Sequence, residues 1–183
     1  MERRKTRVAW NTPGHAHALT FSTYRRRPIL LHPGVAEIFL QRLDASRKLL
    51  EFELWAYVIM PEHVHLVINP VHEGYSISEI LKSLKGPSAK EILRRHPELK
   101  ESCRHQRTNG SQEYRFWQVG GGFDRNLATT QATWTAIQYV HQNPVKRGLC
   151  ESPADWPWSS FLAYSESEAH PPITVDLCRI GTD

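Results

Sequence analysis

The sequence lacks long apolar runs, closely spaced cysteines and internal repeats. Its longest apolar stretch, between Ala56 and Ile68, is interrupted by Pro, Glu and two His, whereas a membrane helix needs about 20 consecutive apolar residues. The first residues, MERRKTR, lead to Trp10 and Pro13 without an apolar segment, which argues against a secretory signal peptide. Three cysteines without C-x-x-C spacing indicate no disulfide framework. We therefore expect a cytoplasmic protein that does not enter a membrane.

Basic residues are concentrated in the first part of the chain. Residues 1–150 hold 22 of the 23 Lys and Arg but only 13 of the 19 Asp and Glu, a net charge of +9 in this part. Residues 163–183 are acidic and rich in Ser and Pro. A basic field of this size attracts polyanions at long range, although charge alone is equally compatible with a solvated surface.

Hydrophobic periodicity predicts an α+β protein. The sequence predicts strands at residues 17–24, 52–60, 64–69 and 114–119, and helices at 33–50, from Ser76 or Ser78 to about 93, and at 127–143. The segments 52–60 and 64–69 are expected to form a hairpin, and Gly86-Pro87 is expected to break or kink the second helix. This order indicates an antiparallel sheet of about four to five strands flanked by helices.

His63 and His65 form a candidate metal site. They are one residue apart within a predicted strand, so both imidazoles face the same side, with Cα atoms about 6.7 Å apart. Such a pair is not distinctive by itself, and His15 and His17 repeat it. The second pair is expected to be structural, because no other candidate ligand lies near it. The apolar residues around the first pair favour a rigid site.

The string MPEHVHLV (60–67) resembles the HUH motif (His, hydrophobic, His) of the single-tyrosine transposases, especially those associated with repetitive extragenic palindromes (REP). Four further segments agree in order: LTFSTYRRRPIL after His17, the helix around Lys85, FWQ (116–118) with Asp124, and YVHQNPVKRGL (139–149). The resemblance covers residues 15–162. It implies the ferredoxin/RRM-like HUH endonuclease fold for a transposase domain at 1–162, followed by an acidic C-terminal tail at 163–183.

The resemblance also implies a mechanism. Tyr139 matches the nucleophile that cuts single-stranded DNA and forms a 5′-phosphotyrosine intermediate. A divalent ion, Mg²⁺ or Mn²⁺, would be held by His63, His65 and a third ligand from the tyrosine helix. Asn143 lies four residues after Tyr139 on the same helical face. Gln142 remains an alternative ligand, whereas His141 points away from Tyr139.

The implied partner is single-stranded DNA that carries a hairpin of the REP type, and no small-molecule cofactor is expected. Six bases near the matched segments are expected to contact phosphates: Arg25, Arg26, Lys85, Arg125, Lys146 and Arg147. The residues 120–122, three consecutive glycines, are expected to let DNA approach or to end a hairpin flexibly. Asp124 is expected either in the site or as a helix N-cap. Related transposases act as dimers or as monomers, and we favour a monomer here.

Two other functions fit parts of the sequence. A non-catalytic binder of single-stranded nucleic acid could use a similar RRM-like sheet, but the aromatic-rich strand of such binders is absent. A metal-dependent phosphoesterase would use an activated water, with Tyr139 only positioning the substrate.

Overall fold

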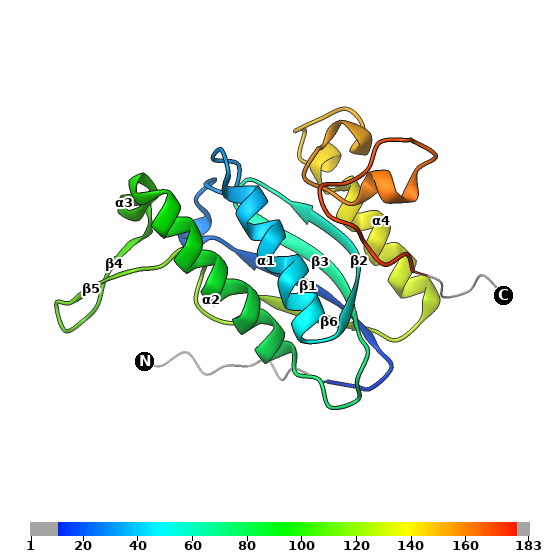
Figure 1. Cartoon of the computed structure of the whole chain (residues 1–183), viewed down its shortest axis with the longest axis horizontal. Coiled ribbons are helices and arrows are strands. Elements are labelled where there is room, and N and C mark those ends of the chain that lie inside the picture. The colour runs from blue at the N-terminus through cyan, green and yellow to red at the C-terminus, as the bar shows by residue number, and fades with distance from the viewer. Residues whose placement is uncertain (1–10, 179–183) are drawn as a thin grey trace.

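The computed structural model describes residues 11–178 (Figure 1). The strands are β1 (Ala16–Ser22), β2 (Phe52–Ile59), β3 (His63–Pro70), β4 (Arg104–Gln106), β5 (Gln112–Tyr114) and β6 (Phe123–Leu127). The α-helices are α1 (Val35–Leu49), α2 (Ile77–Arg95), α3 (Lys100–Cys103) and α4 (Thr130–Lys146). Short 3-10 helices are η1 (Tyr24–Arg26), η2 (Pro97–Leu99), η3 (Pro153–Asp155) and η4 (Phe161–Tyr164).

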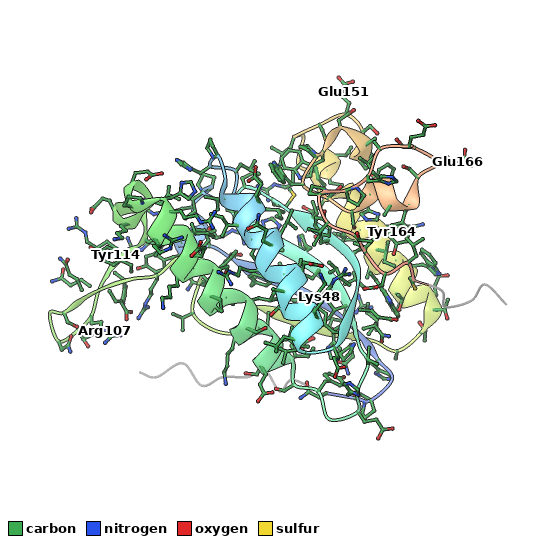
Figure 2. All side chains as sticks on the ribbon, in the orientation of Figure 1. Lys48, Arg107, Tyr114, Glu151, Tyr164 and Glu166 are labelled. Atoms are coloured by element: carbon green, nitrogen blue, oxygen red, sulfur yellow. The ribbon has the colours of Figure 1, made fainter. Side chains whose placement is uncertain are left out.

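The main sheet is antiparallel and contains four strands in the order β2-β3-β1-β6. Thr20 in the inner strand β1 lies opposite His65 on one side and Phe123 on the other. β4 and β5 form a separate hairpin at one end, where Arg107 and Tyr114 lie in Figure 2. The predicted α+β fold, with β2 and β3 as a hairpin, is confirmed.

Helices α1 and α2 cover one face of the sheet (Figure 1). Alternate strand residues point to this face and are almost fully buried: Leu19, Phe21, Leu54, Val64, Leu66 and Ile68. Since burying a Leu, Ile or Phe side chain contributes about 1.5–3 kcal/mol, this core makes the sheet a rigid support.

Helix α4 packs against the other face. Its Ile137 and Val140 contact a second buried cluster that includes Val58 of β2 and Val67 of β3. Trp156 completes this cluster, and its indole Nε1 donates a hydrogen bond to the Ile59 carbonyl (3.0 Å). The sheet is therefore enclosed by helices on both faces, and residues of β3 that alternate with Val64 and Leu66 point toward α4.

Helix α2 continues through Gly86-Pro87, so the expected break does not occur. Ser76 caps its start by accepting a hydrogen bond from Glu79 N. Pro87 lies on the exposed side of the helix, whereas Leu84 and Ser88 on the opposite side are buried. Packing of that inner side offsets the loss of the hydrogen bond that proline cannot make.

The expected strand at 114–119 is wrong in its extent, because β5 ends at Tyr114. The chain then crosses the end of β1, where the Phe116 carbonyl accepts a hydrogen bond from Tyr24 N (2.7 Å) and Gln118 N donates to the Ser22 carbonyl (2.8 Å). Phe116 and Trp117 are both buried. Two successive buried residues do not fit the alternation of a half-exposed strand.

The fourth strand of the sheet is β6, which the sequence did not predict. Of its five residues only Phe123 and Leu127 are apolar, so the period of two is weak. The last helix consequently begins at Thr130 rather than at Leu127, with Thr129 as the N-cap that accepts from Ala132 N (3.1 Å). It ends at Lys146, beyond Pro144.

The described part of the acidic segment, residues 163–178, lies against the edge strand β2 (Figure 1). Asp176 N donates to the Leu54 carbonyl, and the Asp176 carboxylate accepts from Leu54 N and Arg47, each at 2.9 Å. Val175 is buried in the first core. This segment thus contributes to the packing of the domain.

Within residues 11–178, we find no helix with both the length and the apolar character that crossing a membrane requires.

Candidate functional site

His63 and His65 lie on β3 and point toward α4, as the sequence predicts. Their Nε2 atoms are 2.9 Å apart and both side chains are buried. The strand alternation that buries Val64 against α1 and α2 directs both imidazoles to the opposite face. One ion could therefore contact both rings.

Each imidazole has a hydrogen-bond partner on its other nitrogen. His63 Nδ1 donates to Glu62 Oε1 (3.0 Å), and His65 Nδ1 is 2.7 Å from Thr20 Oγ1. Such partners orient a ligating ring and select its tautomer. Sequence reasoning missed both residues: Glu62 directly precedes the motif, but Thr20 is revealed only by its pairing opposite His65.

Glu62 is held by two arginines. Its Oε1 accepts from Arg147 (2.9 Å) and Arg26 (3.2 Å). Burial opposes ionisation of Glu62, but the hydrogen bonds from Arg147 and Arg26 and the charge of Arg147 hold the pKa of this carboxyl below its usual value. Glu62 is therefore an anion that anchors His63.

Both histidines are neutral near pH 7. Burial lowers the pKa of His63, and burial together with the nearby His63 lowers the pKa of His65 to about 3. A neutral imidazole keeps the lone pair that a cation requires.

Helix α4 carries Tyr139 and Asn143 on one face beside the histidines. The Asn143 amide nitrogen lies 3.1 Å from His65 Nε2. The Tyr139 ring is perpendicular to the His65 ring, with centroids 5.5 Å apart, and it is 48% exposed. A phenol from the helix and two imidazoles from the sheet thus meet within one chain, as the sequence motifs predict.

The hydrogen bonds also indicate which atom of Asn143 faces the pair. Since the Glu62 carboxylate can only accept, His63 carries its proton on Nδ1 and presents a lone pair at Nε2. Thr20 Oγ1 can accept a proton from His65 Nδ1, which leaves a lone pair at His65 Nε2 as well. The Asn143 amide nitrogen donates to that lone pair, and an amide flip would turn the amide oxygen toward a cation held there.

The other two candidates on α4 do not reach the histidine pair. His141 is buried, and its Nε2 is 2.9 Å from Ser160 Oγ. Gln142 lies on the exposed side of the helix. The structure therefore brings Asn143, and neither of its neighbours, to His65.

The buried side chain of His141 should make the folded protein less stable in acid. Burial lowers its pKa from 6.5 to about 4, so between these values the unfolded chain binds a proton that the folded chain does not. The free energy of unfolding should fall by about 3 kcal/mol from this residue as the pH drops from 6.5 to 4. Urea unfolding of the metal-free protein across this range measures the slope.

In His141→Gln the pH slope should decrease by about one proton. Equal slopes in His141→Gln and the parent protein would contradict the assignment.

Four of the six predicted basic residues lie around this site. Arg26 and Arg147 bind Glu62, the Lys146 ammonium is 5.1 Å from the centre of the Tyr139 ring, and Arg125 lines a pocket beside Tyr139. Arg25 instead places its guanidinium 5.1 Å from the Tyr24 ring in η1.

Lys85 is bound to the backbone of the loop that contains the three glycines at 120–122. Its ammonium donates to the carbonyl oxygens of Gln118 (2.8 Å) and Gly120 (2.6 Å), and burial lowers its pKa. Asp124 is a residue of β6 and not a helix cap. Its carboxylate is 2.8 Å from Nδ1 of His17, which is fully buried and also bonds Tyr75, as a structural histidine does.

The donor set fits a divalent cation. Two neutral imidazoles and an amide converge within hydrogen-bond distance, and this combination of nitrogen and oxygen ligands suits Mn²⁺ and accepts Mg²⁺. His63, His65 and Asn143 are the residues that would hold it.

Comparisons with known proteins identify the family of this chain. Residues 12–141 match the family model described as IS200-like transposase. A curated relative from Haemophilus influenzae, described as a REP-associated tyrosine transposase, is 28% identical over 120 residues, which cover 66% of this chain. The chain spans 65% of the length of that relative.

A solved structure shows the same fold. A REP-associated tyrosine transposase bound to a REP hairpin superimposes with a TM-score of 0.71, covering 97% of this chain and 95% of that chain at 18% identity. A structure described as a transposase from Deinococcus radiodurans R1 gives a TM-score of 0.48 at 23% identity, covering 78% of this chain and 97% of that chain.

Proposed function

Because this chain belongs to the IS200-like transposase family, we propose that it is a single-tyrosine transposase that cleaves and rejoins single-stranded DNA beside a hairpin. The observation that carries the proposal is the position of the Tyr139 phenol next to the His63–His65 pair and Asn143. The match to a REP-associated relative and the fold shared with a hairpin-bound transposase support it further.

Tyr139 would act as the nucleophile. Its phenol oxygen attacks a phosphodiester, forms a new P–O bond and loses its proton, while the bond from phosphorus to the 3′ oxygen breaks and that oxygen takes up a proton. The products are a 5′-phosphotyrosine and a free 3′-OH. The covalent link retains the energy of the phosphodiester, so the strand can be rejoined without ATP.

His63, His65 and Asn143 would hold Mg²⁺ or Mn²⁺. The bound ion supplies charge neutralisation and Lewis-acid polarisation at the phosphate. Glu62 and Thr20 would keep the two rings in the ligating tautomer. Lys146, beside the Tyr139 ring, would attract the phosphate and stabilise a developing phenolate.

DNA would reach the site along basic residues. Arg26, Arg125, Lys146 and Arg147 lie around Tyr139 and the histidine pair and would supply phosphate contacts that weaken as salt increases. The nucleophile and all three proposed ligands come from one chain, which supports cleavage by a monomer.

The test is incubation of the protein with single-stranded oligonucleotides that carry hairpins and unpaired flanks, with Mg²⁺ or Mn²⁺, followed by a denaturing gel. We expect a protein–DNA adduct that forms only with the metal. Retention of the hairpin without cleavage would instead favour a nucleic-acid-binding module, and cleavage without an adduct would favour a phosphoesterase.

Glu62→Gln should weaken the metal dependence of cleavage. The amide preserves the shape of the side chain but removes the negative charge that accepts the hydrogen bond from His63. Loss of such a hydrogen-bond partner of a metal ligand typically costs about 10–100-fold in metal affinity. The Mn²⁺ concentration for half-maximal adduct formation should rise accordingly.

Glu166→Gln, at an exposed carboxylate visible in Figure 2, is the matched control and should behave as the parent protein. An unchanged Mn²⁺ requirement in Glu62→Gln would show that Glu62 does not support the ligands.

A further inference from the structure

Three metal-binding side chains gather where the segment before α1 meets the end of α2. The two helices lie side by side (Figure 1). His32 precedes α1, His96 follows the last residue of α2, and Glu98 belongs to η2. One ligand atom from each side chain lies within 4.8 Å of the other two. The function proposed above uses none of these three residues.

Glu98 lies between the two imidazoles. Its Oε1 is 3.1 Å from His96 Nδ1 and 3.6 Å from His32 Nε2. The imidazole rings are inclined at 76°, with centroids 5.1 Å apart. Ligand atoms bound at about 2.0–2.1 Å to a tetrahedral Zn²⁺ are about 3.3 Å from one another. The two distances at Glu98 are close to this separation, so the three side chains can share one ion.

Hydrogen bonding does not account for the position of the His32 ring. Its Nδ1 is buried and has no hydrogen-bond partner among residues 11–178, and the 3.6 Å between Nε2 and Glu98 exceeds a normal hydrogen bond. A buried polar atom without a partner costs free energy. Because Nδ1 is enclosed, Nε2 is the nitrogen that can offset this cost by contact with a cation beside Glu98.

The backbone around both histidines is ordered. The His32 carbonyl accepts a hydrogen bond from Val35 N (3.0 Å). His96 N donates to the Ile92 carbonyl (2.8 Å). Gly34 lets the two segments approach each other, because a Cβ atom at this position would lie 3.2 Å from His96 Nε2 and φ is +82°. Ligands that stand on an ordered backbone are already arranged for an ion.

We propose that His32, His96 and Glu98 form a second metal site, which binds Zn²⁺ and fastens the end of α2 to the segment before α1. Two imidazoles and one carboxylate are a ligand set that Zn²⁺ accepts in proteins. The Glu98 side chain is 53% exposed, so water can take the fourth position of a tetrahedral ion. The proposal does not depend on the transposase function.

The second site would also restrain the entry to β3. Leu30 N, two residues before His32, donates to the Pro61 carbonyl (3.0 Å), and Pro61 lies in the turn that leads to His63. An ion held by His32 thus links α2 to this turn through one short segment. Since the ion binds the folded chain, it should raise the temperature of unfolding.

The test is calorimetry of Zn²⁺ binding to the full chain without DNA. The measurements use His63→Ala, in which the site beside Tyr139 has lost a ligand, so that binding reports on the second site. We expect one equivalent of Zn²⁺. Adding His96→Ala should weaken this binding by about 100-fold or more, since loss of even an outer partner of a ligand costs about 10–100-fold.

Glu98→Gln in the same background tests the site without removing a ring. The side chain is largely exposed, so the variant should keep its fold, and Zn²⁺ binding should weaken by at least about 10-fold. His72→Ala is the matched control, because His72 is an exposed histidine that pairs with a single carboxylate, Glu51. It should leave Zn²⁺ binding unaltered.

Thermal unfolding gives a second measurement. Zn²⁺ at about 100 times its dissociation constant should raise the unfolding midpoint of His63→Ala by about 5 °C or more. The rise should be absent when His96→Ala is added. The midpoint without metal identifies a variant that has lost its fold.

Three results would overturn the second site: no Zn²⁺ binding by His63→Ala, binding that persists unchanged with both His96→Ala and Glu98→Gln, or an equal loss with His72→Ala, which would indicate adventitious binding at surface histidines. Each of them leaves the transposase function standing, because adduct formation by the parent protein tests that function separately.

Discussion

Tyr139→Phe is expected to abolish the protein–DNA adduct while hairpin binding stays within about threefold of the parent. The change removes only the phenol oxygen. The ring that packs against His65 and the neighbouring Lys146 remains, so the groove keeps its shape and charge. Removing a nucleophile leaves no group to form the covalent bond, and we expect cleavage to fall by at least about 10³-fold.

Tyr114→Phe is the matched control. Tyr114 is 51% exposed, close to the 48% of Tyr139, but it lies on the β4–β5 hairpin (Figure 2). This variant should form adducts at the parent rate. Denaturing gels with an end-labelled hairpin oligonucleotide measure the adduct, and fluorescence anisotropy measures binding. Cleavage that persists in Tyr139→Phe would replace the tyrosine mechanism with attack by water.

His63→Ala should separate catalysis from binding. The variant loses one of three proposed ligands and leaves Glu62 bound to its two arginines. Mn²⁺ affinity and the rate of adduct formation should each fall by about 100-fold or more. The salt-dependent affinity for the hairpin should change little, because phosphate contacts supply most of it.

His72→Ala, at an exposed histidine that pairs with Glu51, serves as the control for loss of an imidazole. Calorimetry of Mn²⁺ binding to the protein without DNA measures the metal site independently of activity. Equal losses of hairpin binding and cleavage in His63→Ala would contradict a metal role for this residue.

The sequence predicted the parts of the site that depend on local periodicity. The period of two placed His63 and His65 on one face of β3, and the helical repeat placed Asn143 beside Tyr139. The family motif indicated that the strand and the helix meet. In the structure, His63 and Asn143 both lie within hydrogen-bond distance of His65, as these expectations require.

The sequence did not predict what depends on pairing between distant segments. Thr20 supports His65 only because β1 and β3 align in one register, and a shift by one residue would turn its side chain to the other face. β6 was missed because an edge strand with two apolar residues carries little periodic signal. Phe123 and Arg125, which depend on that strand, were consequently not recognised as neighbours of Tyr139.

The acidic segment has a consequence for the outer edge of the sheet. Leu54 bonds Asp176, Tyr57 bonds Ser160 and Ile59 bonds Trp158, so the residues after α4 occupy backbone groups along the open side of β2. Exposed groups of this kind recruit strands from other molecules and lead to aggregation. The carboxyl-terminal part of this protein therefore covers the edge of the strongly apolar strand β2 and prevents it from pairing with strands of other copies of the chain.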